Sequence, residues 1–343
     1  MAVTRNTTQV PAAVHPEDRD AALAWWTVAP GQGELRAEPL SAPGDDEALV
    51  RTLWTGVSRG TETLVARGEV PDSERERMRA PFQEGEFPFP VKYGYLNVGM
   101  VERGPEALHG RIVFGLFPHQ SRFVAPADAL LPVPDGVPPR RAVLAGAVET
   151  AVNVLWDARP LIGDRVVVVG AGTIGAAIAR VARGIPALDV TLVDVDPAKR
   201  QVAEALDVGF ASAAEDVERA DVVIEASGSA AGLQVALQLA ATDGEIVVAS
   251  WYGSRPVEVG LGADFHSRRL TLRSSQVGVV AQARRDRRST RDRLALALRL
   301  LEDPAFDTLL GPSRSWRELP AVTAALADGT PGALCQTIDW SAE

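Results

Sequence analysis

The chain has 343 residues, a net charge of −10 at neutral pH and a single cysteine, Cys335. Its length suits two domains of ordinary size, and one cysteine excludes an internal disulfide framework or a zinc cage built from several thiolates. The negative charge disfavours nonspecific binding to nucleic acid or to anionic membranes. No apolar run approaches the roughly 20 residues that span a bilayer. We therefore expect neither a nucleic-acid nor a membrane partner.

The first 20 residues are polar and lack the apolar core of a secretory signal. We predict a flexible tail over residues 1–20 and a location in the cytoplasm, which also agrees with the low cysteine count.

Short alternating apolar runs, broken by glycine and proline, follow from residue 22 to about residue 134 and predict a β-rich region. Within it, the loop 68–90 carries an apolar group that either walls a substrate pocket or belongs to the ordinary core. Its members are Met78, Phe82, Phe87 and Phe89.

From residue 159 to residue 280, β-branched apolar runs alternate with helical patterns, which is typical of a parallel, doubly wound sheet. The expected strands are 166–169, 190–193, 222–225, 245–250 and 270–275. The remaining chain predicts helices at 291–302 and 318–327 and a last strand at 335–340.

The parallel-sheet region lies between the β-rich region and a tail that carries another strand. This order indicates that the tail folds back on the first domain. We predict four segments: a tail at 1–20, a β-rich domain at 21–157, a parallel-sheet domain at 158–283, and a segment at 284–343 that completes the β-rich domain. The fold class is therefore α/β, with a doubly wound Rossmann sheet.

The stretch 164–196 runs strand, Gly-rich turn, helix, strand, acid, and this context makes G-x-G-x-x-G a specific signal for dinucleotide binding. Gly170 permits the tight turn, Gly172 lets a pyrophosphate approach the backbone, and Gly175 lets the helix pack closely on the strand. Thr173 and Ile174 belong to the helix start, whose free N–H groups attract phosphates. The alternative is a Gly-rich turn in another kind of α/β protein.

Asp194, which ends the second strand, predicts NAD(H) as the cofactor. A carboxylate there accepts hydrogen bonds from the adenosine ribose and repels a 2′-phosphate. Lys199 follows closely enough in sequence to reach the same ribose. Further contacts are expected where later strands end, with simple turns as the alternative. These residues are Ser227, Gly228, Ser250, Ser275, Gln276 and Val277.

With these residues the chain resembles the medium-chain dehydrogenase/reductase superfamily from about residue 22 to residue 340. The segments 58–62, 94–95, 265–269 and 274–278 are similar to the branch that contains bacteriochlorophyllide a dehydrogenase. The resemblance implies a GroES-like β-rich catalytic domain beside the Rossmann domain. It also implies that nucleotide domains dimerise by joining edge strands, here 270–275, which would close an open sheet edge.

Zinc-dependent members of the superfamily differ from this chain at their metal ligands. They carry cysteine where Ser58 follows Thr55-Gly56-Val57, and a His-Glu pair where Tyr95 and Leu96 follow Gly94. The cysteine cluster of their structural zinc lobe is absent from the sequence. Because a hydroxyl and a phenol do not replace thiolate and imidazole, we predict no catalytic and no structural zinc.

Hydride transfer without zinc still requires a group that moves the proton at the substrate oxygen. Tyr95 is a candidate acid/base, with Lys92 as the cation that lowers its pKa, or else it packs in the space of the absent metal. Ser58 either binds the substrate oxygen or caps a helix. Glu62 is either a proton relay or a partner of Arg59.

His119 lies on a loop next to the predicted cleft and is a candidate catalyst, with a satisfied structural histidine as the alternative. His266 is expected to be structural. Glu149 begins a predicted helix and either caps it or contacts the nicotinamide or the substrate.

Together these features predict an NAD(H)-dependent, zinc-independent oxidoreductase that interconverts a secondary alcohol and a ketone on a medium-sized small molecule. One alternative is a reductase of activated C=C bonds of the quinone or enone type. The other is an NAD(H)-binding sensor without catalysis. We expect a homodimer.

Overall fold

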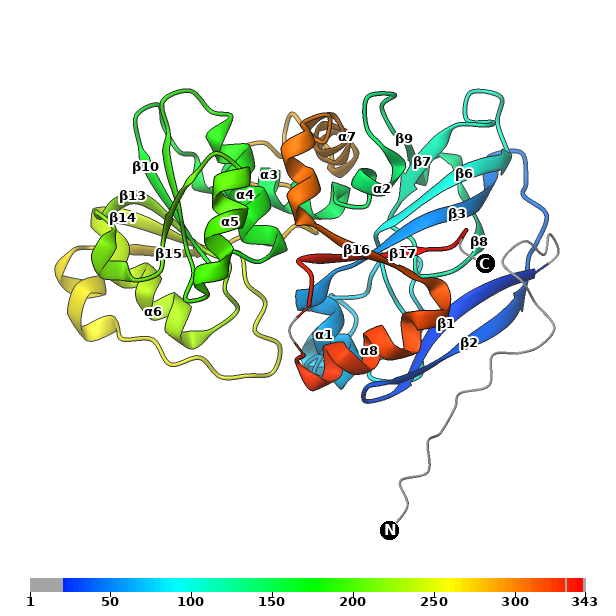
Figure 1. Ribbon diagram of the computed structural model, residues 1–343, viewed down its shortest axis with the longest axis horizontal. Helices are drawn as coiled ribbons and strands as arrows, with labels where there is room; N and C mark the ends of the chain where they lie inside the picture. The colour runs from blue at the N-terminus through cyan, green and yellow to red at the C-terminus, as the bar shows by residue number, and fades with distance from the viewer. Residues whose placement is uncertain (1–20, 331, 342–343) are drawn as a thin grey trace, which may run out of the picture. The chain divides into compact units, whose positions relative to one another are not determined.

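The computed structural model describes residues 21–330 and 332–341, so the predicted tail at 1–20 lies outside the described residues. The chain divides into two compact units (Figure 1). The β-rich unit contains the chain up to Val133, Pro312–Gly332 and the residues from Gln336 onwards. The parallel-sheet unit contains Pro134–Gly311 and Ala333–Cys335.

Six parallel strands form the sheet of the parallel-sheet unit, in the order β12-β11-β10-β13-β14-β15. Their bounds are β10 Arg165–Val169, β11 Asp189–Val193, β12 Gly209–Ala211, β13 Ala220–Glu225, β14 Ala240–Val248 and β15 Thr271–Ser274. Counted along the chain this order is 3-2-1-4-5-6, the order of the Rossmann fold. The predicted doubly wound sheet is confirmed, and only β12 is too short to show a pattern.

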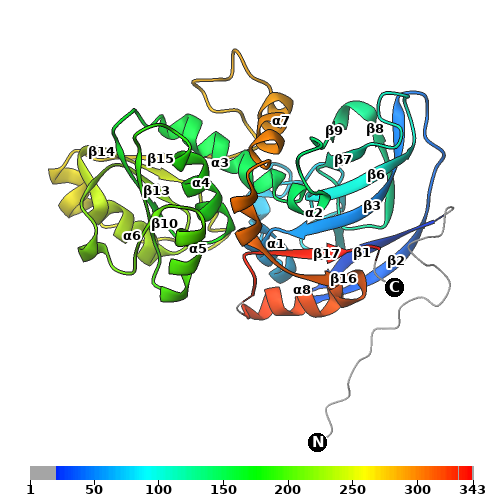
Figure 2. The same ribbon diagram turned by 45° about the horizontal axis from the view of Figure 1, so that its top comes forward.

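Helices cover both faces of this sheet (Figure 2). Alternate residues of β10 point to opposite faces, and Val167 and Val169 pack with Leu233 and Leu237 on one of them. The helices are α2 Pro139–Ala142, α3 Ala145–Ala158, α4 Thr173–Arg183, α5 Arg200–Ala205, α6 Ala230–Leu239 and α7 Thr290–Leu300. Two sheet-covering helix layers bury the Val-rich strands on both sides, which explains their continuous apolar runs.

Two sheets make up the β-rich unit, one in the order β2-β1-β5-β4 and one in the order β16-β17-β3-β6-β7-β9, with β8 also paired to β3. The bounds in the first sheet are β1 Ala21–Ala29, β2 Gln32–Pro39, β4 Glu84–Gly85 and β5 Val91–Lys92. Those in the second are β3 Glu47–Val57, β6 Asn97–Arg103, β7 Ile112–Gly115, β8 Arg122–Pro126, β9 Leu130–Pro132, β16 Leu310–Ser315 and β17 Cys335–Asp339.

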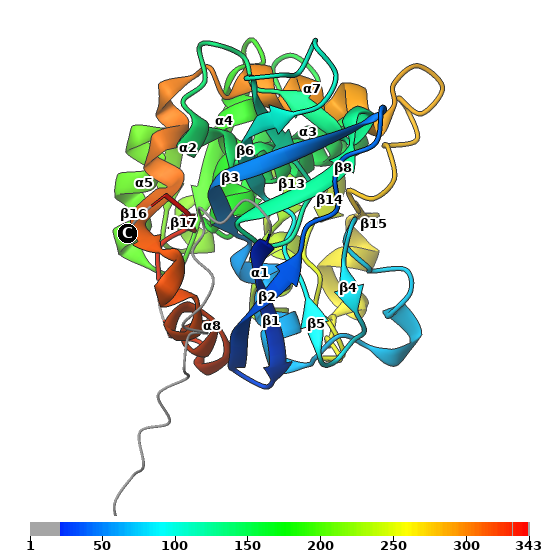
Figure 3. The ribbon, with the colours of Figure 1, turned by 90° about the vertical axis from the view of Figure 1, so that its right-hand side faces the viewer.

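The C-terminal strand β17 returns to this unit and pairs antiparallel with β3, from Gln336 opposite Val57 to Asp339 opposite Trp54. The rings of Trp316 and Trp340 stack with centroids 6.5 Å apart. The unit also holds helices α1 Arg59–Arg67 and α8 Leu319–Asp328, and α8 lies beside the β1–β2 hairpin (Figure 3). The returning tail thus supplies part of the unit's core.

The unit boundaries differ from the predicted domain boundaries. Residues 134–157 and 284–311 belong to the parallel-sheet unit, because α3 packs against α4 and α7. The chain returns to the β-rich unit at Pro312 rather than at residue 284. None of the described helices combines the length and the apolar character that a membrane crossing requires.

Candidate active site

The Gly-rich turn after β10 has the shape that a dinucleotide site needs. Gly170 has φ +102°, and a Cβ there would lie 2.6 Å from the backbone nitrogen of Ser227. A Cβ on Gly175 would lie 1.8 Å from the carbonyl oxygen of Gly170. Gly172 is the N-cap of α4, and a Cβ there would meet open space. The first and last glycines are therefore required by packing, whereas the middle one faces open space.

Asp194 lies directly after β11 and is tied to this turn. Its Oδ2 accepts a hydrogen bond from the backbone N–H of Ala171 at 2.7 Å, and its Oδ1 accepts one from the N–H of Asp196 at 2.9 Å. An ionised carboxylate has further lone pairs on both oxygens, so capacity for ribose hydroxyls remains. Lys199 ends a short helix, Pro197–Lys199, which Asp196 caps.

Thr173 and Ile174 are the first two residues of α4, so they belong to the helix start. Thr173 and Ile174 are half-buried at the start of α4. The Thr173 hydroxyl donates to the carbonyl oxygen of Leu334 at 2.6 Å.

A buried glutamate that the sequence reading missed organises the turn after β13. Glu225 is fully buried, and its Oε1 accepts from the N–H and the hydroxyl of Ser227 at 2.7 and 2.6 Å and from the N–H of Gly228. The same N–H also meets the Ser250 hydroxyl at 2.9 Å. Ser227, Gly228 and Ser250 therefore share one network at the carboxyl ends of β13 and β14. The sequence signal that could have revealed Glu225 is a single acidic residue at the end of an apolar strand.

Glu225 also holds Tyr252. The Tyr252 hydroxyl donates to Glu225 Oε2 at 2.8 Å. Burial, and then the hydrogen bond to this carboxylate, raise the pKa of Tyr252 well above its ordinary value. Tyr252 is therefore part of the Glu225 network.

The segment after β15 begins with the predicted residues Ser275, Gln276 and Val277. The Ser275 N–H donates to the Val248 carbonyl at the end of β14, and its hydroxyl donates to Asp157 at 2.7 Å.

Glu149 does not cap the helix that contains it. It is buried within α3 and accepts from Arg293 at 2.9 Å, so the predicted capping role is wrong.

In the β-rich unit, Tyr95 and Ser58 form a hydroxyl pair. The Tyr95 hydroxyl donates to Ser58 Oγ at 2.6 Å, and both residues are half-buried. Ser58 precedes α1, but its side chain makes no capping hydrogen bond. Gly94 has φ +125°, and a Cβ there would lie 2.8 Å from the His119 ring. A glycine is therefore required where the backbone of residue 94 passes the His119 ring.

His119 is 2% exposed and has partners on both ring nitrogens. Its Nε2 lies 3.0 Å from Glu62 Oε2, and its Nδ1 lies 2.7 Å from Thr55 Oγ1. The indole Nε1 of Trp340 donates to the same Thr55 hydroxyl at 3.0 Å. Because an indole is only a donor and an ionised carboxylate only an acceptor, Trp340 donates to the Thr55 hydroxyl and Nε2 of His119 donates to Glu62.

Glu62 connects this buried chain to Ser58. Its second oxygen accepts the backbone N–H of Ser58 at 2.7 Å. Arg59 does not pair with Glu62, because its guanidinium donates to the carbonyls of Thr330 and Gly332. The predicted Glu62–Arg59 pair is therefore wrong, and Glu62 holds the Ser58 loop against His119.

Lys92 is placed elsewhere than predicted. It is 1% exposed, and its ammonium contacts Glu38 at 2.6 Å and Glu84 at 2.5 Å. Two carboxylates already neutralise this charge. Lys92 therefore holds β2, β4 and β5 together, and the prediction that it is the cation for Tyr95 is not supported by its contacts.

Tyr95 contacts the aromatic side chain of Tyr93, which in turn contacts Phe87. The Tyr93 ring meets Tyr95 edge-on at 5.9 Å and packs against Phe87 at 5.7 Å. Burial, followed by the neighbouring Tyr95 and Glu62, raises the pKa of Tyr93. Phe82 is 38% exposed and stacks on Phe117. The predicted apolar group is thus divided between core, at Phe87, and partly open surface, at Phe82.

His266 lies after β14 in the parallel-sheet unit and is exposed. No group of three or more His, Cys, Asp or Glu side chains suited to a metal ion occurs in residues 21–330 and 332–341.

No family model matches the chain. Over 148 residues, 40% of this chain, it is 26% identical to 2-dehydro-3-deoxy-L-galactonate 5-dehydrogenase of Pseudoalteromonas atlantica, and the match spans 43% of that protein. The acetophenone reductase of Geotrichum candidum, solved with NAD, is 16% identical with a TM-score of 0.75, over 94% of this chain and 98% of that one. L-idonate 5-dehydrogenase of Escherichia coli is 14% identical with a TM-score of 0.74, over 93% and 98%. The chain therefore has the fold of these two enzymes, a Rossmann domain with a GroES-like domain.

Proposed function

We propose that the protein is an NAD(H)-dependent oxidoreductase that interconverts a secondary alcohol and a ketone without zinc. The observation that carries the proposal is the Tyr95–Ser58 hydroxyl pair, which stands where the resemblance expects metal ligands. The Gly-rich turn in the same chain keeps the open space beside Gly172 that a pyrophosphate needs.

The residues of the parallel-sheet unit fit a dinucleotide. The α4 N-terminus would hold the pyrophosphate, and Asp194 would hold the adenosine ribose and disfavour a 2′-phosphate. The turn 226–228 and the segment after β15 would line the same sheet edge. When bound, the nicotinamide ring accepts or donates the hydride.

The hydroxyl pair supplies the proton chemistry. Ser58 Oγ already accepts the Tyr95 proton, so the Ser58 proton is directed at a further acceptor, here the substrate oxygen. During ketone reduction, Ser58 gives its proton to the developing alkoxide and regains one from Tyr95. During alcohol oxidation both transfers reverse. Half-burial of Tyr95 lets the phenol exchange its proton with water.

Glu62 and His119 position this pair. Both His119 nitrogens are occupied, and Glu62 takes the Ser58 N–H. Their role is therefore to fix the Ser58 backbone rather than to touch the substrate. The proposed substrate is a small molecule of medium size, and Phe82 is the exposed aromatic side chain of the apolar group in the loop 68–90.

A panel assay tests the reaction class. NADH and NADPH oxidation would be measured with a series of ketones and, separately, with enones and quinones. The proposal expects turnover of at least one ketone with NADH as the preferred donor. Turnover confined to enones or quinones would favour C=C reduction, and tight NADH binding without any turnover would favour a sensor.

We also propose a homodimer through β15. This strand ends the six-stranded sheet, and Leu272 within it is 39% exposed. A second copy pairing with this edge would satisfy its open backbone groups.

A further inference from the structure

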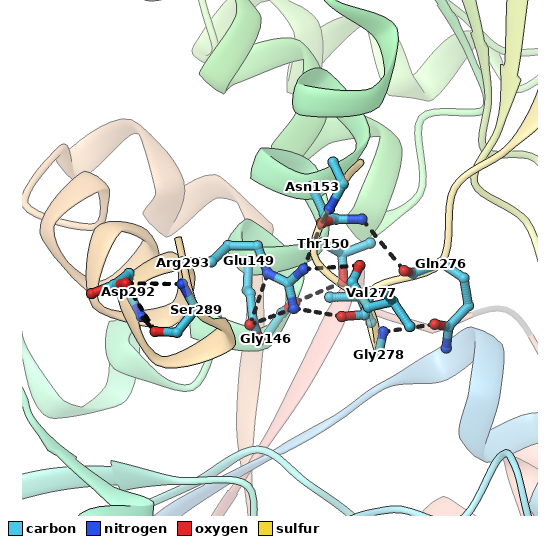
Figure 4. A network of polar contacts seen from close by, with 12 residues as sticks. Gly146, Glu149, Thr150, Asn153, Gln276, Val277, Gly278, Ser289, Asp292 and Arg293 are labelled. Atoms are coloured by element: carbon cyan, nitrogen blue, oxygen red, sulfur yellow. Dashed lines mark hydrogen bonds and ion pairs between the residues drawn. The ribbon is translucent and has the colours of Figure 1, made fainter. Parts of the chain in front are cut away.

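Arg293, on α7, is a fully engaged buried arginine that the proposed chemistry does not use (Figure 4). It is 1% exposed. Its Nε and Nη2 donate to Glu149 Oε1 at 3.0 and 2.9 Å, and its Nη1 donates to the Val279 carbonyl at 3.3 Å. Shorter contacts join it to Asn153 Oδ1 and the Val277 carbonyl. All five N–H groups of the guanidinium therefore have acceptors.

Asn153, on α3, is the second arm of this network. Its Oδ1 also accepts the N–H of Ala281 at 3.0 Å, and its Nδ2 donates to the Gln276 carbonyl at 3.4 Å. Together the two side chains form hydrogen bonds with the segment 275–281 at four backbone positions. Side chains from two helices thus fix a segment that has no strand or helix of its own.

This segment lies where the nicotinamide end of the proposed cofactor would bind. It starts at the carboxyl end of β15, and its Ser275 is bonded to the end of β14. Ligands of such sheets bind at that edge. The hydrogen bonds from Arg293 and Asn153 use the carbonyls of Gln276, Val277 and Val279. The N–H of Gly278 donates to the Gln276 side chain at 2.7 Å. The N–H of Val277 stays outside these contacts.

A buried arginine–glutamate pair adds little net stability, because removing both charges from water costs about as much as their attraction returns. Fixing backbone donors before a ligand arrives, by contrast, raises affinity by lowering the ordering cost of binding. The arrangement is therefore better explained by the position of the segment than by stabilisation of the fold.

We propose that Arg293, together with Asn153, is a positioning residue that holds the segment 275–281 as a rigid edge for the nicotinamide carboxamide. The inference rests on the proposed NAD(H) function. The carboxamide needs an N–H donor for its oxygen and carbonyl acceptors for its amide hydrogens, and backbone held at fixed spacing supplies both.

The experiment compares NADH with ADP-ribose, which lacks the nicotinamide ring, by titration calorimetry on full-length protein. Arg293→Lys keeps the charge beside Glu149 but cannot span the carbonyls. Arg141→Lys is the matched control, because Arg141 is also buried in this unit, on Asp307 and the Leu301 carbonyl. Asn153→Ala provides a second test should Arg293→Lys not fold.

The proposal expects Arg293→Lys to weaken NADH binding about tenfold, equivalent to about 1.4 kcal/mol, and to leave ADP-ribose binding unchanged. The fluorescence of bound NADH should also become less polarised, since the ring is held less firmly. Arg141→Lys should change neither affinity.

Equal losses for both ligands, or no loss for either, would overturn the positioning role and leave the proposed function standing. Wild-type protein that binds ADP-ribose as tightly as NADH would do the same. Wild-type protein that binds neither ligand would overturn the proposed function, and the positioning role with it.

Discussion

Tyr95 is the residue on which the proposed chemistry depends most directly. Replacing it by phenylalanine keeps the ring that packs on Tyr93 but removes the hydroxyl that donates to Ser58. We expect kcat for ketone reduction to fall about 100-fold or more, the usual contribution of a general acid, with NADH affinity unchanged. Steady-state kinetics and NADH titration measure the two effects.

Tyr93→Phe is the control, because it removes a neighbouring phenol that the mechanism does not use. It should lower kcat far less than Tyr95→Phe does. Equal rates for Tyr95→Phe and wild type would contradict the assignment of the acid.

We propose that Asp194 determines the choice between the two nicotinamide cofactors. Asp194→Ser removes the carboxylate that would face the ribose, so we expect NADH binding to weaken about tenfold and discrimination against NADPH to narrow. Asp189→Asn, at the opposite end of β11, should leave both affinities unchanged. A variant that still rejects NADPH as strongly as wild type would show that another residue sets the preference.

Glu149 gives a pH dependence whose sign follows from its burial. Burial raises the pKa of Glu149 above its ordinary value of 4.5, with Arg293 opposing the shift. Above 4.5 the folded chain still holds a proton that the unfolded chain has released. The contribution of this group to stability is therefore largest below that value and falls as pH rises through the folded-state pKa.

Glu149→Gln should remove this effect. We expect the unfolding free energy of wild type, relative to Glu149→Gln, to decrease as pH rises above 4.5, measured by urea denaturation. Glu258→Gln, at an exposed site in the same unit, should show no such trend. A relative stability that increases over this range would contradict the raised pKa.

At the scale of elements, the strand β15 carries the assembly proposal. Leu272→Glu places a charge on the exposed edge of the sheet, so we expect the dimer to dissociate to monomers in light scattering at micromolar concentration. Leu261→Glu, at another exposed apolar side chain, should leave the mass unchanged. A monomeric wild-type protein would rule out the dimer.

The elements themselves were largely predictable. The Val-rich runs specify β10, β11 and β13, because a strand buried on both faces needs apolar side chains throughout. The position of α3 was not predictable in the same way. Its buried residues cover most of its surface, so its pattern does not indicate which neighbours it packs against, and the domain boundary was placed after it.

Across the whole molecule, local motifs point to candidate site residues but not to the residues that hold them in place. Tyr95, Ser58 and Asp194 stand out because each occupies a fixed place in a motif. Trp340 contacts Thr55 across 285 residues of sequence, and Arg293 contacts Glu149 across 144. No local sequence pattern spans such separations. Lys92 was misassigned because closeness to Tyr95 along the chain does not decide where its side chain points.

We propose that the Tyr95–Ser58 hydroxyl pair replaces a catalytic zinc ion. This is tested by the rate of ketone-dependent NADH oxidation by chelator-treated protein, with zinc content determined on the same sample. We expect an undiminished rate with far less than one zinc per chain. A rate that is lost with the metal and restored by added Zn²⁺, at about one zinc per chain as in catalytic zinc sites, would contradict it.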